Sequence, residues 1–298
     1  MTSPPVARSP HSARSRIGAH VPASGGLART ALPFAAAIGA EAVQVFATNP
    51  RGWAPSKGDP AQDTAFRKAV GESLPAYVHA SFLINLGSPD TAIADRSIQS
   101  LAHTVRRAHD IGARGVVVHT GSAVVAGGYA SAMAQTRDLL LPLLDGLSDD
   151  EPDVLLEPTA GQGQSLCSTL DELDAYLDNL GHHGKLGLCI DTCHVFAAGH
   201  DLAAPGAMND FLDHLDKIRG AVPLRLIHAN DSKDVVGAHK DRHQTIGDGH
   251  IGAAPFGDLM AHPLLAGVPL VLETSGDQEQ LHKDIALLKS LRCRTEPG

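Results

Sequence analysis

Histidine and carboxylate side chains follow short apolar runs along much of the chain, and both side-chain types can bind metal ions. Each one alone fits an ordinary structural role, such as a hydrogen-bonded histidine, a helix cap or an ion pair. Several of them brought together in a buried place would repel one another or stay unsatisfied unless cations held them. The residues are His79 in VHAS, His119 in VVVHTGS, Glu157 in LLEPTAGQG, Asp191 and His194 in CIDTCH, His228 in LIHANDSK and Glu273 in LVLETSG.

One further pair, Asp241 and His243, lies in the glycine-rich segment HKDRHQTIGDG. The combined set of five histidines, two aspartates and two glutamates mixes nitrogen and oxygen ligands. Such a set suits Zn²⁺, whereas Mg²⁺ prefers oxygen ligands and water. The chain also has 17 histidines against one tryptophan and three tyrosines, and imidazole is the commonest metal ligand in proteins. The residue types therefore predict a zinc site.

Eight short apolar runs are the expected strands, and most of the candidate ligands stand at their ends. Helical patterns separate the runs, which favours a closed parallel TIM (β/α)8 barrel as a single domain over residues 17–298. An open doubly wound sheet is the alternative. Because the active site of a TIM barrel lies at the C-terminal strand ends, six strands would each deliver a ligand to one mouth. The expected strands are Ile17–Val21, Ala42–Phe46, Ala76–His79, Gly115–His119, Val154–Glu157, Leu186–Asp191, Leu224–His228 and Leu270–Glu273.

Two of the intervening helices have recognisable start signals. Ser88 and Pro89 are expected as the N-cap and the first helical residue of one helix, ahead of an apolar stripe at helical spacing. Thr169 and Glu172 are spaced as a capping box at the start of another helix.

The overall charge excludes one mode of nucleic-acid binding. The chain has 24 Lys and Arg against 33 Asp and Glu, and its formal net charge is −9. Proteins that bind nucleic acid by broad electrostatic attraction normally carry a basic surface. Any contact with nucleic acid must therefore use local positive charge, including bound metal ions.

Cysteine content and the first residues indicate a cytoplasmic protein. Four cysteines in 298 residues do not form a disulfide framework. Cys189 and Cys193, which flank Asp191, are expected to be buried thiols. No apolar run approaches a membrane span. Residues 1–16, which are rich in Ser, Pro and Arg, are expected to form a disordered tail rather than a secretory signal, or else a basic arm that touches DNA phosphates.

Six motifs together resemble the endonuclease IV family of apurinic/apyrimidinic endonucleases, from about Ile17 to about Leu291. They are IGAHVPASGGL, HASFLINLG, LLEPTAGQG, CIDTCHVFAAG, HANDSK and DRHQTIGDGHIG. The resemblance implies three zinc ions, with Mn²⁺ as an alternative at one position, and it implies catalytic roles for Glu157 and Glu273. All nine ligand positions hold the expected residue type. The implied sets are His79, His119 and Glu157 for the first ion, Glu157, Asp191, His228 and Glu273 for the second, and His194, Asp241 and His243 for the third.

The chain departs from the family pattern beside the ligands, and no departure removes one. Pro22 stands where Ser is usual, and Asp248 replaces the usual Glu of the glycine-rich loop. Pro158 follows the bridging carboxylate where Asn is usual, and Ser275 lies in TSG where TPN is common.

The resemblance also implies a substrate, namely double-stranded DNA with an abasic site, incised on its 5′ side during base excision repair. The products would be a 3′-hydroxyl and a 5′-deoxyribose phosphate, and blocked 3′ ends would be a second substrate. Arg51, Phe82 and Leu83 match residues that enter the duplex, with Phe82 where Tyr is common, and Lys233 would contact a phosphate. Without the resemblance, Phe82 and Leu83 fit core packing, and Arg51 and Lys233 fit solvated side chains. A monomer in the bacterial cytosol, at the nucleoid, is expected.

Two other functions stay open. Sugar isomerases and epimerases use related barrels with one or two divalent ions, but the set of His194, Asp241 and His243 has no purpose in such a site. A protein that binds abasic DNA without cleaving it would also need the metal ligands, and the changes at Pro158 and Ser275 keep that alternative open.

Overall fold

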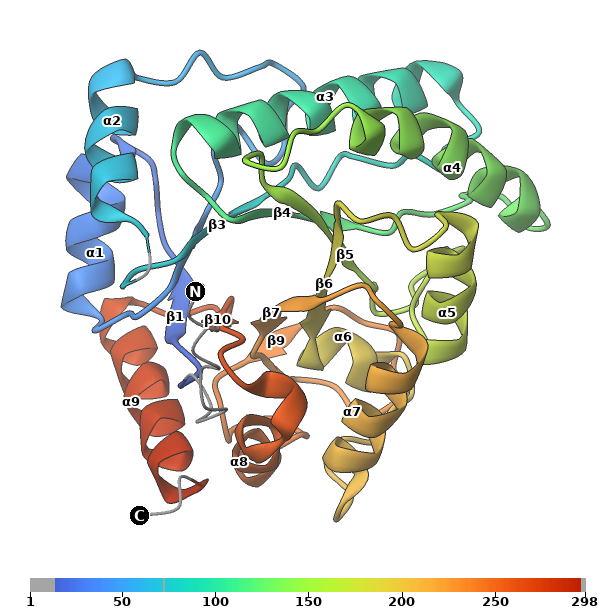
Figure 1. Cartoon of the computed structure of the whole chain (residues 1–298). Helices are drawn as coiled ribbons and strands as arrows, with labels where there is room; N and C mark the ends of the chain where they lie inside the picture. The colour runs from blue at the N-terminus through green and yellow to red at the C-terminus, as the bar shows by residue number, and fades with distance from the viewer. Residues whose placement is uncertain (1–13, 72, 296–298) are drawn as a thin grey trace, which may run out of the picture.

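The computed structural model describes residues 14–71 and 73–295 of the chain. Within them, eight parallel strands form a closed barrel in the order β1-β10-β7-β6-β5-β4-β3-β2, and helices surround it (Figure 1). The barrel strands are β1 Ile17–His20, β2 Val43–Val45, β3 Ala76–His79, β4 Gly115–His119, β5 Asp153–Glu157, β6 Leu186–Asp191, β7 Leu224–His228 and β10 Leu270–Leu272.

The helices lie outside the barrel, and α8 packs against both α7 and α9. A short antiparallel pair, β8 Asp231–Ser232 with β9 His243–Gln244, stands apart from the barrel sheet. The helices are α1 Leu32–Ala37, α2 Pro60–Ala69, α3 Thr91–Asp110, α4 Tyr129–Asp145, α5 Leu170–Asn179, α6 Thr192–Ala197, α7 Ala207–Ile218, α8 Ala254–Ala261 and α9 Gln278–Thr295, with a π-helical turn at Leu27–Ala31 and a 3-10 turn at Pro263–Leu265.

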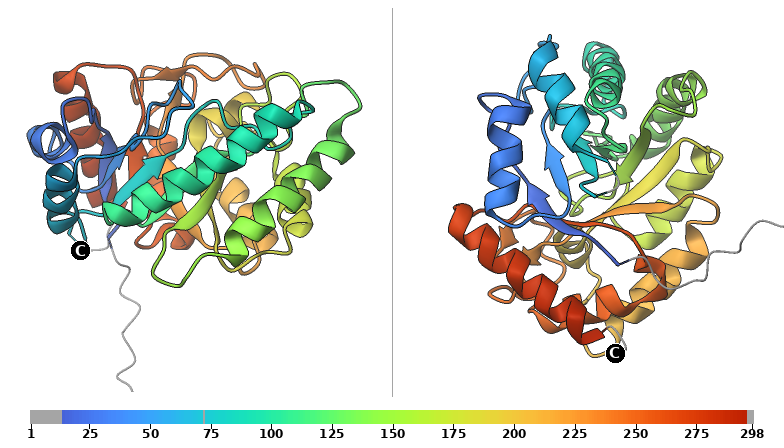
Figure 2. Two further views of the ribbon diagram at one scale, coloured as in Figure 1. Left: turned by 90° about the horizontal axis from the view of Figure 1, so that it is seen from above. Right: turned by 60° about the vertical axis from the view of Figure 1, so that its left-hand side comes forward.

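All eight predicted strands are confirmed, and no strand end differs from its prediction by more than one residue. The sheet closes where β1 pairs in parallel with β10, with Ile17 opposite Leu270. This pairing excludes the open doubly wound sheet. In the left view of Figure 2, the segments after β2 (blue) and after β7 (orange) lie along the same edge of the barrel.

The predicted start of α3 is wrong by two residues. Asp90, not Ser88, is the N-cap, because its Oδ1 accepts the backbone N–H groups of Ala92 and Ile93 at 2.9 and 3.4 Å. The hydroxyl of Ser88 instead accepts the N–H of Asp90 at 3.2 Å and shapes the turn before the helix. The capping box of Thr169 and Glu172 is present at the start of α5, as predicted.

The core has two layers. The larger one fills the space between the outer face of the strands and the helices. The smaller one fills the barrel itself and consists of Ala42, Tyr77, Val117, Leu155, Cys189, Leu226 and Val271. Because side chains two residues apart in a strand point to the same face, the residue two positions after each of these also points into the barrel, toward its C-terminal mouth.

Residues 14–16 belong with the barrel rather than with a disordered tail. Ser15 is buried, its hydroxyl donates to the carbonyl of Leu265 at 2.7 Å, and its own carbonyl accepts from Arg292 at 2.6 Å. The prediction of a disordered tail for residues 1–13 lies outside the described residues. Within the part of the chain that the structure describes, no helix is both long and apolar enough to cross a membrane.

Candidate metal centre

Each of the seven apolar residues inside the barrel is followed, two positions later, by a polar side chain at the C-terminal mouth. β1 also ends in a polar residue, His20. The ring therefore contains six of the expected ligands together with two residues that were not expected as ligands. Its members are His20, Gln44, His79, His119, Glu157, Asp191, His228 and Glu273.

Glu157, at the end of β5 and fully buried, is the point where four imidazoles meet. Its Oε2 lies 3.4 Å from His79 Nε2 and 3.3 Å from His119 Nε2. Its Oε1 lies 2.8 Å from His228 Nδ1 and 3.5 Å from His194 Nδ1. The two oxygens face different pairs of rings, which is the arrangement a carboxylate needs to bridge two cations.

The residues of the second expected set also converge. His228 Nδ1 lies 3.2 Å from Glu273 Oε2 and 3.9 Å from Asp191 Oδ2. Ligand atoms of these three residues and Glu157 all lie within 4.8 Å of one another. Asp191 offers only Oδ2, because its Oδ1 caps α6 by accepting two backbone N–H groups at 2.6 and 3.0 Å.

The third expected set joins the first turn of α6 to the segment after β8. Asp241 Oδ1 lies 3.3 Å from His194 Nε2 and 3.1 Å from His243 Nε2. His243 Nε2 is also 3.4 Å from Asp191 Oδ2, so this set adjoins the second one. The structure thus brings all nine expected ligand residues into three adjacent groups, and Glu157 is shared by two of them.

The separations within the first and third groups fit zinc. Two atoms bound at about 2.0–2.1 Å to one tetrahedral zinc ion lie roughly 3.4 Å apart. The nitrogen-to-oxygen distances in the first and third groups run from 3.1 to 3.4 Å. Two of these atoms, Glu157 Oε2 and His243 Nε2, are buried without a hydrogen-bond partner. An unpartnered buried polar atom is costly, and a cation between the facing ligands would satisfy both atoms.

The charges of the cluster shift the pKa values of its members strongly. Burial alone would lower the pKa of His194, but carboxylates, Asp191 and Asp241 among them, raise it well above its usual value. The same two carboxylates outweigh burial at His243 and raise its pKa to about 9. Burial would raise the pKa of Glu157, yet the neighbouring imidazoles hold it well below its usual value. The raised pKa values of His194 and His243 favour protonated rings beside the carboxylates in the metal-free protein, and binding of zinc would displace those protons.

Gln44, in the middle of β2, is a residue that sequence reasoning missed. Its Oε1 accepts from His228 Nε2 at 2.9 Å. Its Nε2 donates to Glu273 Oε1 at 2.6 Å and to His20 Nδ1 at 3.0 Å. One amide therefore holds two expected ligands and His20. The signal that could have revealed it is its position two residues after Ala42, on the face that lines the barrel.

Asp231, in β8, fixes the glycine-rich loop next to the third group. Its buried carboxylate accepts five backbone N–H groups at 2.7–3.2 Å. A Cβ atom on Gly249 would lie 2.4 Å from Asp231 Oδ1, so the loop can approach the carboxylate only with glycine there. The donors are Ser232, Gly247, Gly249, Ile251 and Gly252.

The two cysteines beside the cluster are buried, as predicted. Burial raises the pKa of the Cys189 thiol to about 12. It also raises the pKa of Cys193, whose Sγ lies 3.6 Å from the carbonyl of Arg242. With these raised pKa values both side chains stay neutral thiols that pack against the site. The thiolate is the form that binds metal, so neither cysteine is expected as a ligand.

One of the candidate DNA contacts, Phe82, lines the mouth, which is a pocket of about 340 Å³. Phe82 lines the pocket and is 50% exposed, so it is not a core residue, whereas Leu83 is half-buried. The Phe82 backbone N–H donates to the carbonyl of Pro50 at 3.1 Å, which ties this loop to the loop that carries the exposed Arg51. Lys233 is exposed, and it follows β8.

Pro158, one of the unusual residues beside the ligands, still supports the site. Its carbonyl accepts from His194 Nδ1 at 3.1 Å, which leaves Nε2 of that ring toward Asp241. Proline lacks only the backbone N–H, so this acceptor is kept. Ser275 is exposed and lies two residues beyond Glu273.

Several known proteins are similar to this chain in sequence or in fold. A family model described as a xylose isomerase-like TIM barrel matches residues 32–291. A probable endonuclease 4 of Streptomyces avermitilis is 55% identical over 285 residues, which cover 95% of this chain and 92% of that protein. The crystal structure of endonuclease IV from Thermus thermophilus is 31% identical, with a TM-score of 0.80, and the match covers 94% of this chain and 99% of that one. A D-tagatose 3-epimerase-like protein, 17% identical with a TM-score of 0.69 over 94% of this chain and 98% of that one, shares the fold alone.

Proposed function

The chain belongs to the endonuclease IV family, and from that premise we propose that it is a three-zinc phosphodiesterase that incises DNA at abasic sites. Incision on the 5′ side of the lesion would leave a 3′-hydroxyl and a 5′-deoxyribose phosphate. Removal of blocking groups from 3′ ends would be a second activity of the same site. We further propose that the protein acts as a monomer on the chromosome in the bacterial cytosol.

One observation carries the proposal, namely three adjacent ligand groups of which two share the buried carboxylate of Glu157. The first ion would be held by His79 and His119 with Glu157, and one ion could be Mn²⁺. The second would be held by Glu157, Asp191, His228 and Glu273, and the third by His194, Asp241 and His243. Zinc, when bound, makes water nucleophilic near neutral pH and offsets the charge of a phosphate.

Side chains of the metal centre determine where a phosphate can be hydrolysed. Glu157 and Glu273, the expected catalytic carboxylates, are both ionised, because neighbouring imidazoles outweigh the effect of burial and lower their pKa values. Gln44 holds Glu273 Oε1 at 2.6 Å, which leaves Oε2 toward His228 and the centre of the site. The side chains can thus receive a phosphate in one orientation without first rearranging.

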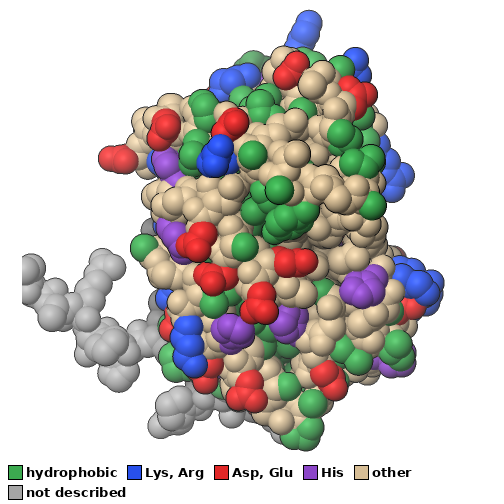
Figure 3. Space-filling view, turned by 90° about the vertical axis from the view of Figure 1, so that its right-hand side faces the viewer, with side chains coloured by type: hydrophobic (Ala, Val, Ile, Leu, Met, Phe, Trp, Pro, Cys, Tyr) green, Lys and Arg blue, Asp and Glu red, His purple; other side chains and the backbone are tan. Residues whose placement is uncertain are grey.

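Local charge explains how an acidic protein can bind DNA. On the face in Figure 3, Asp and Glu side chains are spread widely, and Lys and Arg do not gather into a basic patch. Three Zn²⁺ ions would exceed the charge of the four carboxylates at the mouth by about two units, and such a local excess attracts phosphate. Arg51, Phe82 and Leu83 would then enter the duplex at the lesion, and Lys233 would meet the backbone.

The sugar epimerase alternative rests on the fold alone. Such a site needs one or two ions, and the group of His194, Asp241 and His243 would be superfluous in it. Activity on ketoses with Mn²⁺, and none on abasic DNA, would favour that alternative. Tight binding of abasic DNA without cleavage at saturating zinc would instead favour a binding protein.

Incision of a synthetic abasic duplex tests the proposal. The zinc-loaded protein should cut the strand at the lesion and leave a 3′ end that a DNA polymerase can extend. Prolonged chelation should abolish the cut, and added zinc should restore it. An undamaged duplex of the same sequence is the control substrate.

A further inference from the structure

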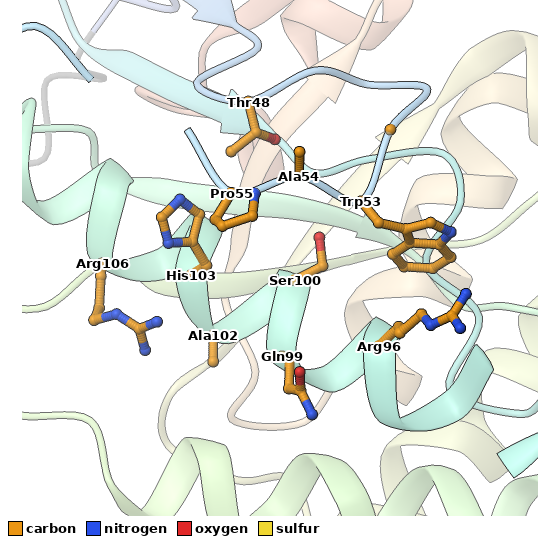
Figure 4. Close-up of a pocket in the computed structure, with 11 residues that line it drawn as sticks. Thr48, Trp53, Ala54, Pro55, Arg96, Gln99, Ser100, Ala102, His103 and Arg106 are labelled. Carbon is orange, nitrogen blue, oxygen red and sulfur yellow. The ribbon is translucent and has the colours of Figure 1, made fainter. Parts of the chain in front are cut away.

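A second pocket, of about 460 Å³, lies outside the metal centre between helix α3 and the segment that follows β2 (Figure 4). Residues 48 and 52–55 form one wall, and side chains of α3 form the other. The first wall includes the residue that follows Arg51, a candidate DNA contact. The α3 wall consists of Arg96, Gln99, Ser100, Ala102, His103 and Arg106.

The pocket is positively charged. Arg96 and Arg106 both line it, and Figure 4 shows them at opposite ends of the α3 wall. Among the described residues, neither guanidinium has an ion-pair partner, and no acidic side chain lines the pocket. The neighbouring Arg107, by contrast, is paired with Asp63 and Asp110 at 2.9 and 3.0 Å. Two uncompensated charges stand out in a chain of net charge −9.

Besides the two arginines, the pocket contains two aromatic side chains, Trp53 and His103. Trp53 is partly buried, packs against the main core and also faces the pocket. His103 Nε2 is buried and has no hydrogen-bond partner among the described residues. The pocket thus combines two free cations, an aromatic ring and an unsatisfied ring nitrogen.

We propose that this pocket binds an unpaired strand of DNA, with phosphates at Arg96 and Arg106 and a base stacked on Trp53. The two arginines are ten residues apart on one helix, a rise of about 15 Å, so one small anion cannot reach both. A strand with several phosphates can. Cationic side chains with an aromatic platform are the usual means of binding single strands. That the strand is DNA rests on the proposed function.

The pocket contains its own reporter, because Trp53 is the only tryptophan of the chain. Zinc-loaded full-length protein is titrated with an undamaged oligothymidylate, which requires no incision. Tryptophan fluorescence should change saturably with the oligonucleotide. It should respond more weakly to a duplex of equal length, whose bases are already stacked, and to inorganic phosphate at equal phosphate concentration.

Charge variants test which side chains bind. Arg96→Gln and Arg106→Gln should each reduce the slope of log affinity against log salt by about 0.7, the value for one phosphate contact of a single strand. Ser100→Asp, which adds a carboxylate between the arginines, should abolish the fluorescence response. Arg137→Gln makes the same charge change on α4, outside the pocket, and should leave both quantities unchanged.

Three results would overturn the proposal. They are no fluorescence change with the oligonucleotide, an unchanged salt slope in both arginine variants, or a full response to inorganic phosphate alone. Incision of an abasic duplex, measured on the same preparation, reports separately on the metal centre. If the protein does not incise the abasic duplex but its fluorescence responds to the oligonucleotide, the proposed function is wrong and the proposal that the pocket binds single-stranded DNA still holds.

Discussion

The side-chain oxygen of Gln44 accepts a hydrogen bond from His228 Nε2 at 2.9 Å. This contact determines which ring nitrogen of His228 keeps its proton when the ring is neutral, as it must be to bind a metal ion. In the metal-free protein Nδ1 is protonated as well and donates to Glu157 Oε1 at 2.8 Å. When zinc displaces that proton, the proton on Nε2 stays, and the lone pair is on Nδ1, the atom that faces Glu157 and Glu273 at 2.8 and 3.2 Å. Gln44 therefore prepares His228 to bind a metal ion through Nδ1.

Gln44→Met should weaken zinc binding at the second position by about 10- to 100-fold, as loss of a group that orients a metal ligand commonly does. The substitution keeps the volume of the side chain and removes all three of its hydrogen bonds. Zinc titration by competition with a chelator measures the affinity, and ¹⁵N chemical shifts of His228 in the zinc-loaded protein measure the tautomer. Gln278→Met, at the exposed first residue of α9, is the control. If neither the zinc affinity nor the His228 tautomer changes in Gln44→Met, Gln44 does not orient His228 for metal binding.

Asp241→Asn and His243→Ala should each lower the zinc content from three ions per chain to two and abolish most incision of abasic DNA. Neither residue is an expected ligand of the first or second ion, so those two sets keep all their ligands, although His243 Nε2 also lies 3.4 Å from Asp191 of the second set. Metal analysis and incision are measured on the same preparations. His250→Ala, at an exposed position of the same loop, should change neither quantity. Full incision by either ligand variant would contradict a catalytic role for the third ion.

Asp231→Ala should destabilise the protein and disorder the glycine-rich loop. The buried carboxylate accepts five backbone N–H groups, and hydrogen bonds to a charged group contribute about 1.5–3 kcal/mol each. Water can reach part of the loop, so we expect a net loss of roughly 3 kcal/mol in the free energy of unfolding, measured by denaturant titration. Asp248→Ala, an exposed acid in the same loop, should cost less than about 0.5 kcal/mol. Equal effects of the two variants would refute the role of Asp231.

Much of the site was predictable because strand ends and ligand types coincide. Apolar runs give the barrel strands, and the motifs give His79, His119 and the other expected ligands at their ends. Gln44 was missed because a lone polar residue in a three-residue strand points inward or outward depending on register, and register follows from pairing with the neighbouring strands.

The N-cap of α3 and the role of Asp231 were not predicted correctly, for two different reasons. Ser88-Pro89 and Asp90 are both acceptable helix starts, and the side chain that reaches the free N–H groups of the first turn decides between them. The role of Asp231 depends on five donors up to 21 residues away in sequence, a distance over which spacing alone carries no information.

Glu41 should make stability depend on pH in the acid range. Burial would raise the pKa of this carboxyl group, but hydrogen bonds from Arg292 and from the Ile17 N–H outweigh burial and lower it to about 2. A folded-state pKa below the unfolded value of about 4.3 means that the stabilisation is present above that pH and is lost as pH falls toward 2. Denaturant titrations from pH 5 to pH 2.5 should show this loss in the wild type and a weaker dependence in Glu41→Gln. Identical pH profiles would contradict it.

The zinc content of the purified chain, measured together with its incision of an abasic duplex during stepwise chelation, tests the three-zinc site most directly. A three-zinc phosphodiesterase should hold three zinc ions per chain at full activity. Its activity should be lost as the first ion leaves, and added zinc should restore it. Incision of abasic DNA at full rate with one ion or none, or three bound ions without incision, would contradict a three-zinc catalytic site.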